Sequence, residues 1–231
     1  MKHYILTRWN QLHDNSHVYN FKGITDPEKW NEERMNLFEK YCLFSVNAQV
    51  NKDFTWVLAF NSKTPKKYYE KYQKYPYIKI IFDMHPFTYM NKIYGKEIKK
   101  GDWIATTRLD NDDCLHPNYI KEVKSKFDNK YALVDTAGCQ FDVKNNTFHD
   151  SGRRYPNSPF LTVFEKAGEF SDHPIHTAYY KSHTNLHLSF KERSRILISD
   201  KGKLYCQIIH DNNVCNKING EKISIKNNFF K

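Results

Sequence analysis

Apolar stretches of strand length alternate with polar, lysine-rich stretches over roughly the first 130 residues. Five stretches have the apolar and β-branched content typical of strands: residues 4–7, 54–60, 77–82, 103–109 and 131–134. The stretch 54–60 is flanked by polar residues on both sides, which is typical of a strand covered on both faces. Alternation of this kind predicts an α/β fold with a largely parallel sheet and right-handed crossovers.

The stretches between the predicted strands carry helix start signals. Thr25-Asp26-Pro27-Glu28 places a capping Thr three residues before a Glu, with a Pro near the first helical position. Apolar and long side chains then recur at helical spacing: Trp30, Arg34, Leu37, Phe38 and Tyr41. Thr64-Pro65 predicts the start of a short polar helix, and His116-Pro117 predicts a helix that runs to about residue 127.

The pattern changes after residue 135, where short β-like runs and Asn, Gly and Pro turns become frequent. No Ser/Gly-rich or Pro-rich linker divides the two parts, and no internal repeat is visible. We therefore expect one domain over residues 1–231, in which an α/β half is followed by a more irregular, partly antiparallel half.

Composition adds a preference for anionic partners and a reducing compartment. Lys and Arg number 36 against 26 Asp and Glu, and the resulting charge of +10 favours nucleotides, nucleic acid or an acidic membrane surface. The five cysteines contain no Cys-x-x-Cys pair, which argues against a disulfide framework and a thiolate zinc site. No apolar run suits a signal peptide or a membrane span, so we expect a soluble, cytoplasmic protein.

The sharpest chemical feature is an acidic cluster directly after the predicted strand 103–109: Arg108-Leu109-Asp110-Asn111-Asp112-Asp113. Asp and Asn are also common in plain surface turns. A position at the carboxyl end of a sheet strand, however, is where open α/β sheets place ligands. Carboxylates there bind Mg²⁺ or Mn²⁺ together with substrate phosphates. A basic protein with one compact acidic cluster is therefore suited to bind a metal–diphosphate ligand.

The segment Thr107 to Asp113 resembles the metal-binding segment of GT-A glycosyltransferases, and especially that of the rhamnosyltransferase family. Further blocks similar to this family follow one another in the same order: Leu6-Thr7-Arg8-Trp9-Asn10, Trp30-x-x-x-Arg34, Leu37-Phe38, Ser45-Val46-x-x-Gln49, Phe54-x-Trp56, Ser158-Pro159-Phe160 with Glu165, and Gln207-Ile208-Ile209-His210-x-Asn212. The resemblance covers most of the chain and is far more specific than Asp-x-Asp alone.

The resemblance implies a single GT-A domain, Rossmann-like, with a mixed, mostly parallel sheet. In this interpretation residues 1–113 bind the nucleotide and residues 114–231 receive the acceptor. The implied activity is inverting transfer of a sugar such as L-rhamnose from a UDP- or dTDP-sugar to a hydroxyl of a glycan or a lipid-linked acceptor. A lipid-linked acceptor would bring the enzyme to a membrane surface as a peripheral protein.

The resemblance also implies roles for the acidic cluster. Asp112 would bind Mn²⁺ or Mg²⁺, Asp110 would contact the ribose or share the metal, and Asp113 would support the cluster. His210 follows an apolar strand and matches a family block. It is therefore predicted to be either a further metal ligand or the capped end of a strand.

Three residues are expected beside the nucleotide. Arg8, at the end of the first strand, and Arg108 would lie near the nucleotide. Asn61 stands before Ser-Lys-Thr-Pro, where related sequences more often carry Asp. Its contact with the nucleobase is therefore left open.

Two carboxylates are candidates for the base that deprotonates the acceptor hydroxyl. Glu165 ends the apolar run 160–164, and Asp172 opens a His-rich segment where it also suits a helix cap. Of the two, Glu165 is the preferred candidate.

The alternative function is that of a nucleic-acid protein, either a metal-dependent nuclease using Asp110 to Asp113 or a basic binding module. The segment Lys66 to Tyr75 interleaves basic and aromatic residues, as proteins that hold single strands do. A helix with tyrosines inward and lysines in solvent gives the same pattern and needs no ligand, so we expect no nucleic acid.

Overall fold

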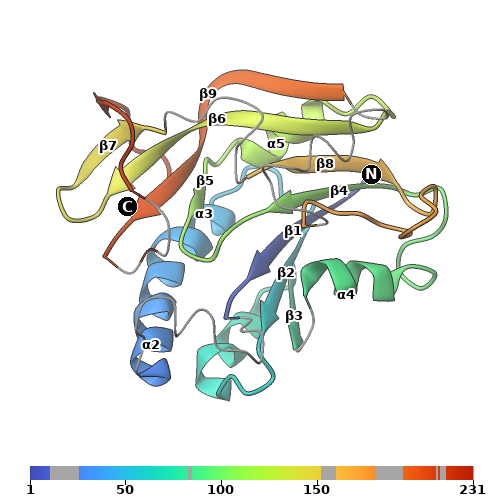
Figure 1. Ribbon diagram of the computed structural model, residues 1–231, viewed down its shortest axis with the longest axis horizontal. Coiled ribbons are helices and arrows are strands. Elements are labelled where there is room, and N and C mark those ends of the chain that lie inside the picture. Colours follow the sequence, from blue (N-terminus) through green and yellow to red (C-terminus); the bar gives the residue numbers. More distant parts are fainter. Residues whose placement is uncertain are drawn as a thin grey trace.

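A computed structural model describes residues 1–10, 26–82, 85–151, 160–179, 195–211, 213 and 217–230. Its centre is a single mixed sheet in the strand order β10-β7-β6-β8-β4-β1-β2-β3, with β9 paired to β6 and β5 paired to β9 (Figure 1). The architecture is α/β, as the alternation of strand and helix signals predicted.

The first four strands form the parallel part of the sheet. They are β1 (Lys2–Arg8), β2 (Thr55–Phe60), β3 (Ile78–Phe82) and β4 (Trp103–Arg108), and β1 pairs in parallel with both β2 and β4. Each predicted strand up to residue 109 is confirmed to within two residues at either end. Because the strands are parallel, their carboxyl ends lie at one edge of the sheet.

The C-terminal half is mixed, as expected from the change of pattern after residue 135. β8 (Thr162–Lys166) is antiparallel to both β4 and β6, whereas β9 is parallel to β6. The remaining strands are β5 (Cys114–Leu115), β6 (Ala132–Asp142), β7 (Thr147–Asp150), β9 (Arg195–Ile209) and β10 (Lys222–Ile223). β6 continues well beyond the predicted strand 131–134.

The predicted N-terminal helix begins at Pro27. α2 (Pro27–Leu37) continues into a wider π-helical segment, η1 (Phe38–Leu43), and then into α3 (Phe44–Asn47). The side chain of Asp26 caps α2 by accepting hydrogen bonds from the N–H groups of Glu28 and Lys29. The expected capping residue Thr25 lies outside the described residues.

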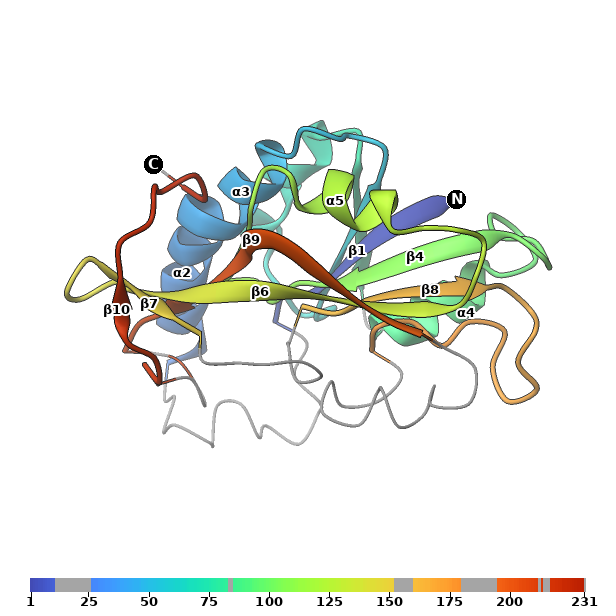
Figure 2. The ribbon, with the colours of Figure 1, turned by 90° about the horizontal axis from the view of Figure 1, so that it is seen from above.

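Helices cover both faces of the sheet. α2, α3 and α5 (Tyr119–Ser125) lie on one side, and α4 (Pro86–Ile93) lies on the other (Figure 2). The larger core cluster, on the side of α2 and α5, includes Trp9, Phe38 and Trp56, all buried. The cluster on the other face includes Met90 and Ile93 of α4.

The segment 64–75 is not the continuous helix that the sequence predicted. It forms two 3₁₀ turns, η2 (Lys66–Tyr68) and η3 (Glu70–Lys74). Tyr68 and Tyr72 are buried in the core, so their rings are not available to stack on bases.

Three of the four lysines of this segment are paired with acidic residues rather than left as a basic stripe. Lys66 forms an ion pair with Glu70, Lys67 with Glu28 and Glu32, and Lys71 with Glu39. Inward tyrosines and neutralised lysines favour the interpretation in which this segment needs no ligand.

No helix in the described part of the chain is long and apolar enough to cross a membrane. Four cysteines, Cys42, Cys114, Cys139 and Cys206, are free and buried. The fifth, Cys215, lies outside the described residues.

Candidate functional site

The acidic cluster lies at the carboxyl edge of the parallel strands, beside the ends of β1 and β2. Leu109 N–H donates to the carbonyl of Leu6 at 3.0 Å, and Trp9 N–H donates to the carbonyl of Ala59 at 2.8 Å. These bonds extend the sheet past the formal ends of β4 and β1. They bring Arg8 and Arg108, which end the neighbouring sheet strands β1 and β4, to the same edge.

The three carboxylates of the cluster have three different partners. Asp110 pairs with Arg108, with 3.1 Å between Oδ2 and Nη2. Asp112 contacts Arg34 and His210 through its Oδ2. Asp113 accepts a backbone hydrogen bond from Ile208 at 2.8 Å. The mutual repulsion of three neighbouring aspartates is thereby offset by partners from α2, β4 and β9.

Asp112 is the most strongly held of the three. His210 Nε2 lies 3.0 Å from its Oδ2, and the guanidinium of Arg34 contacts the same oxygen. Burial raises the pKa of the Asp112 carboxyl, but the charge of Arg34 and the contact with His210 outweigh it and lower the pKa to about 2. Asp112 is therefore an anion at neutral pH despite being only 8% exposed.

Asp113 is fully enclosed and helps to place His210. Burial, reinforced by the charges of Asp112 and Asp110, raises the pKa of the Asp113 carboxyl well above its usual range. Its bond to Ile208 fixes β9 two residues before His210. The His210 N–H in turn donates to Asn213 Oδ1, whose amide donates to the carbonyl of Ile208 at 3.2 Å. His210 thus stands on a strand end that is braced from both sides.

Asp112 and His210 form a pair of donors, an oxygen and an imidazole nitrogen, that fits Mn²⁺ or Mg²⁺. Among the described residues, no group of three His, Cys, Asp or Glu side chains is close enough to hold a metal ion. Asp110, the expected third ligand, is turned to Arg108. Ions of this kind often take only one or two carboxylates and complete their shell with water and substrate phosphates. Asp112 and His210 are therefore the two candidate ligands, and Arg34 contacts the same Asp112 oxygen as His210.

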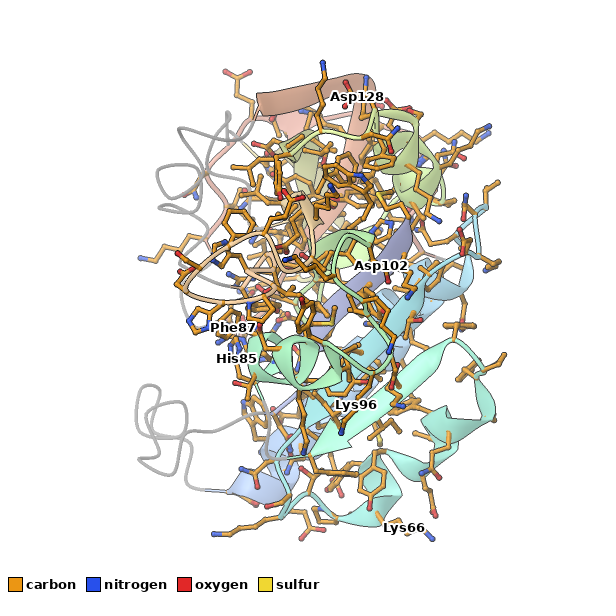
Figure 3. All side chains as sticks on the ribbon, turned by 90° about the vertical axis from the view of Figure 1, so that its right-hand side faces the viewer. Lys66, His85, Phe87, Lys96, Asp102 and Asp128 are labelled. Carbon is orange, nitrogen blue, oxygen red and sulfur yellow. The ribbon has the colours of Figure 1, made fainter. Side chains whose placement is uncertain are left out.

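The side chains of Arg8 and Arg108 both pack against Tyr179, a residue that was not predicted from the sequence to belong to the site. Each guanidinium lies 5.2 Å from the ring centroid of Tyr179, which is buried. His85, at the start of α4 in Figure 3, packs edge-on against the same ring at 5.2 Å. No spacing rule links residue 179 to either arginine, so only the fold could reveal this contact. Two guanidinium groups gathered at one point are candidates for binding an anion, and Arg108 already pairs with the Asp110 carboxylate.

Asn61 lies directly after β2 in a polar turn. Its Oδ1 accepts from Lys63 N–H at 2.9 Å, and its N–H donates to Asn10 Oδ1 at 3.0 Å. Asn10 also donates to Thr64 Oγ1 and to Asn31 Oδ1. This network ties the loop after β2 to the end of β1 and to α2, and it places Asn61 at the carboxyl edge where the nucleotide was expected.

The structure does not bring Glu165 to the acidic cluster. In the register of β8 against β4, Glu165 faces Ile104, at the opposite end of β4 from Arg108. Its two oxygens accept hydrogen bonds from the N–H groups of His176 and Thr177, both at 2.8 Å. Burial raises the pKa of Glu165 to about 7 against the lowering effect of these two donors. The carboxylate anchors the segment that leads to Tyr179.

Asp172, the second candidate base, lies on that same segment. Its side chain is 48% exposed, and Oδ1 lies 2.7 Å from Nε2 of His176. It also accepts a hydrogen bond from the N–H of His173. The Asp172 carboxylate is thus open to solvent, whereas the Glu165 carboxylate is buried.

Comparison with known proteins identifies a family. Residues 10–147, more than half of the chain, match the family described as “Putative rhamnosyl transferase”. No curated protein matches the chain.

Among solved structures, the chain is similar to S. aureus TarS in complex with UDP-GlcNAc, at 13% identity and a TM-score of 0.46. That similarity covers 91% of this chain and 59% of the TarS chain, so this chain is the shorter of the two. It is also similar to the inositol-1-phosphate CTP transferase from T. maritima, at 10% identity and a TM-score of 0.43, covering 90% of this chain and 89% of that one. Similarity of this extent does not carry an activity from these proteins to this chain. The family match does establish membership: the chain belongs to the putative rhamnosyl transferase family.

Proposed function

We propose that this protein is a metal-dependent glycosyltransferase. It transfers a sugar, with inversion, from a nucleoside-diphosphate donor to a hydroxyl acceptor on a glycan or glycolipid. The observation that carries this proposal is that the parallel strands carry two groups at their carboxyl edge, Asp112 with His210 and Arg8 with Arg108. Membership of the family supports the same reaction class.

The reaction requires stabilisation of the negative charge that develops on the departing diphosphate. A divalent ion bound there acts as a Lewis acid and offsets that charge. In the proposal Asp112 and His210 hold the ion. Arg8 and Arg108 donate charge-assisted hydrogen bonds to phosphate oxygens, with Tyr179 keeping the two guanidinium groups together.

The acceptor hydroxyl needs a base on the opposite face of the sugar. We propose Asp172 ahead of Glu165 for this role, which reverses the order preferred from the sequence. Asp172 is accessible and paired with His176, whereas both Glu165 oxygens are engaged by backbone donors. The roles of both residues are open to direct test.

Thermal shift with UDP or dTDP, with and without Mn²⁺, tests the proposed function. Stabilisation by a nucleoside diphosphate that grows with Mn²⁺ is the expected result, because a ligand bound only to the folded state raises its stability. No response to either nucleotide, together with salt-sensitive binding to DNA or RNA, would instead indicate the nucleic-acid alternative.

The family description supports L-rhamnose as the proposed sugar. A donor-hydrolysis panel over UDP- and dTDP-sugars tests it, with dTDP- or UDP-rhamnose expected to turn over fastest. Turnover of glucose or galactose donors alone would refute rhamnose while leaving glycosyl transfer intact.

A further inference from the structure

Arg34 occupies the same carboxylate oxygen that faces the candidate metal ligand His210. Its Nη1 contacts Asp112 Oδ2, and His210 Nε2 lies 3.0 Å from that oxygen. Arg34 comes from the last turn of α2, whereas His210 follows β9. A cation supplied by the chain itself therefore sits where the ligand oxygen would meet a divalent ion.

The fold holds Arg34 in this position through several contacts. Its guanidinium lies 5.1 Å from the ring centroid of Trp30, one turn earlier on α2, and 3.4 Å from Asn111 Oδ1. Asn111 in turn donates to the carbonyl of Trp9 at the end of β1. Only 8% of the Arg34 side chain and 11% of the Asp112 side chain are exposed. The pair is a buried feature of the site rather than a mobile surface contact.

Arg34 and a divalent ion compete for the Asp112 oxygen that faces His210, Oδ2. Their repulsion is strong because little water screens it. Removing the guanidinium without replacing it would leave the buried Asp112 anion without its main counter-charge. A divalent ion is the replacement that satisfies both conditions.

We propose that Arg34 is the resident counter-cation of Asp112, which a divalent ion displaces when it binds. This inference rests on the proposed function, since it assigns Arg34 a role toward the metal of that same site. Arg34 is a positioning residue here: it sets how tightly the site takes the ion before the donor arrives.

The test is a titration with Mn²⁺ in the absence of nucleotide. Its two readouts are the EPR signal of the free ion and the melting temperature of the protein. Arg34→Met removes the competing charge and should tighten Mn²⁺ binding by about tenfold. It should also lower the melting temperature without metal and enlarge the rise that Mn²⁺ produces. Arg34→Lys keeps a positive charge at the site, so its Mn²⁺ affinity should stay closer to that of the wild type.

Lys67→Met is the matched control, because it removes one positive charge beside α2 from exposed pairs with Glu28 and Glu32. Its Mn²⁺ affinity should equal that of the wild type. Equal tightening in Lys67→Met would mean that only net charge matters, and this would overturn the inference. Unchanged or weaker Mn²⁺ binding by Arg34→Met would overturn it as well.

A measurement on the unaltered protein covers the case in which Arg34→Met does not fold. The Nε–H resonance of Arg34 should shift when Mg²⁺ saturates the site, and an unmoved resonance would overturn the inference. The proposed function is assessed separately, by Mn²⁺-dependent binding of UDP or dTDP to the wild type. Nucleotide binding with an unmoved Arg34 would refute this inference alone, whereas loss of all nucleotide binding would refute the function.

Discussion

The Asp113 carboxylate accepts a hydrogen bond from the N–H of Ile208, at 2.8 Å and across 95 residues of sequence. This one contact joins the acidic cluster to β9, and it stands two residues before His210. Because β9 is also paired with β5 and β6, the bond sets where the strand ends. His210 reaches Asp112 because Asp113 holds the strand on which it stands.

Asp112→Asn should weaken Mn²⁺-dependent binding of UDP or dTDP by at least about 10–100-fold. Loss of an outer-shell partner of a metal already costs that much, and Asp112 is proposed to bind the metal directly. Turnover should fall with it, because the amide is a poor ligand for the ion. Calorimetric titration of the nucleotide with and without Mn²⁺ measures the effect. Asp53→Asn is the matched control, since Asp53 pairs with Lys124 on an exposed part of the surface. Equal losses in both variants would contradict a metal role for Asp112.

Glu165→Gln should destabilise the fold, because one of the two backbone N–H donors, of His176 or Thr177, would then face an amide NH₂. Loss of such a buried acceptor costs about 1–3 kcal/mol, which urea unfolding can measure. Nucleotide affinity should change little. A variant that folds like the wild type but loses turnover would instead make Glu165 the base.

Asp172→Asn should lower kcat by about 10²–10⁴, the usual contribution of a general base. Its melting temperature and nucleotide affinity should stay near those of the wild type, because the side chain is half exposed. Full turnover in this variant would exclude Asp172 as the base.

Tyr179→Leu should weaken binding of UDP or dTDP, because Arg8 and Arg108 lose the ring that gathers them. Two cation–π contacts of about 0.5–1 kcal/mol each correspond to roughly 5–30-fold in affinity. Tyr179→Phe keeps the ring and should bind normally. Tyr94→Leu removes a ring from the same core cluster away from the arginines, and controls for lost packing. Equal weakening by Tyr94→Leu would contradict a specific role for Tyr179.

Stability should fall as the pH drops below about 6.5 because of His3, which is buried against Thr107 Oγ1 at 2.8 Å. Burial, with the Lys124 charge adding and Asp53 opposing, lowers the pKa of His3 to about 3. The folded imidazole stays neutral while the unfolded one takes up a proton below pH 6.5, so protonation favours unfolding between these values. His3→Gln should flatten the pH dependence by about 1.4 kcal/mol per pH unit near pH 5–6. If urea unfolding gave the same pH dependence of the free energy of unfolding for the wild type and His3→Gln, the result would contradict this prediction.

Local sequence determined the elements that depend on a short stretch of chain. The apolar run 54–60 became β2, because such a stretch must be covered on both faces wherever it lies. The acidic cluster follows β4, because the strand and the turn residues are adjacent in sequence. Resemblance to a known family then indicated which of these residues to group into one site.

Two predictions from the sequence concerned features that tertiary packing decides and that a local pattern does not contain. The segment 64–75 has helical spacing, yet it forms two 3₁₀ turns in which Tyr68 and Tyr72 enter the core. Glu165 ends an apolar run, yet β8 runs antiparallel to β4 and carries it away from the acidic edge. Strand direction is a property of the sheet, so the run itself could not specify it.

The sequence by itself determined the α/β class, the parallel N-terminal strands and the position of Asp110 to Asp113 at a strand end. Only the tertiary structure decided the partner of each carboxylate: Arg34 with Asp112, Arg108 with Asp110, and Ile208 with Asp113. The physical reason is range. Strand and turn preferences act over a few neighbouring residues, whereas a buried charge takes as partner whichever opposite charge or donor the packed elements bring to it.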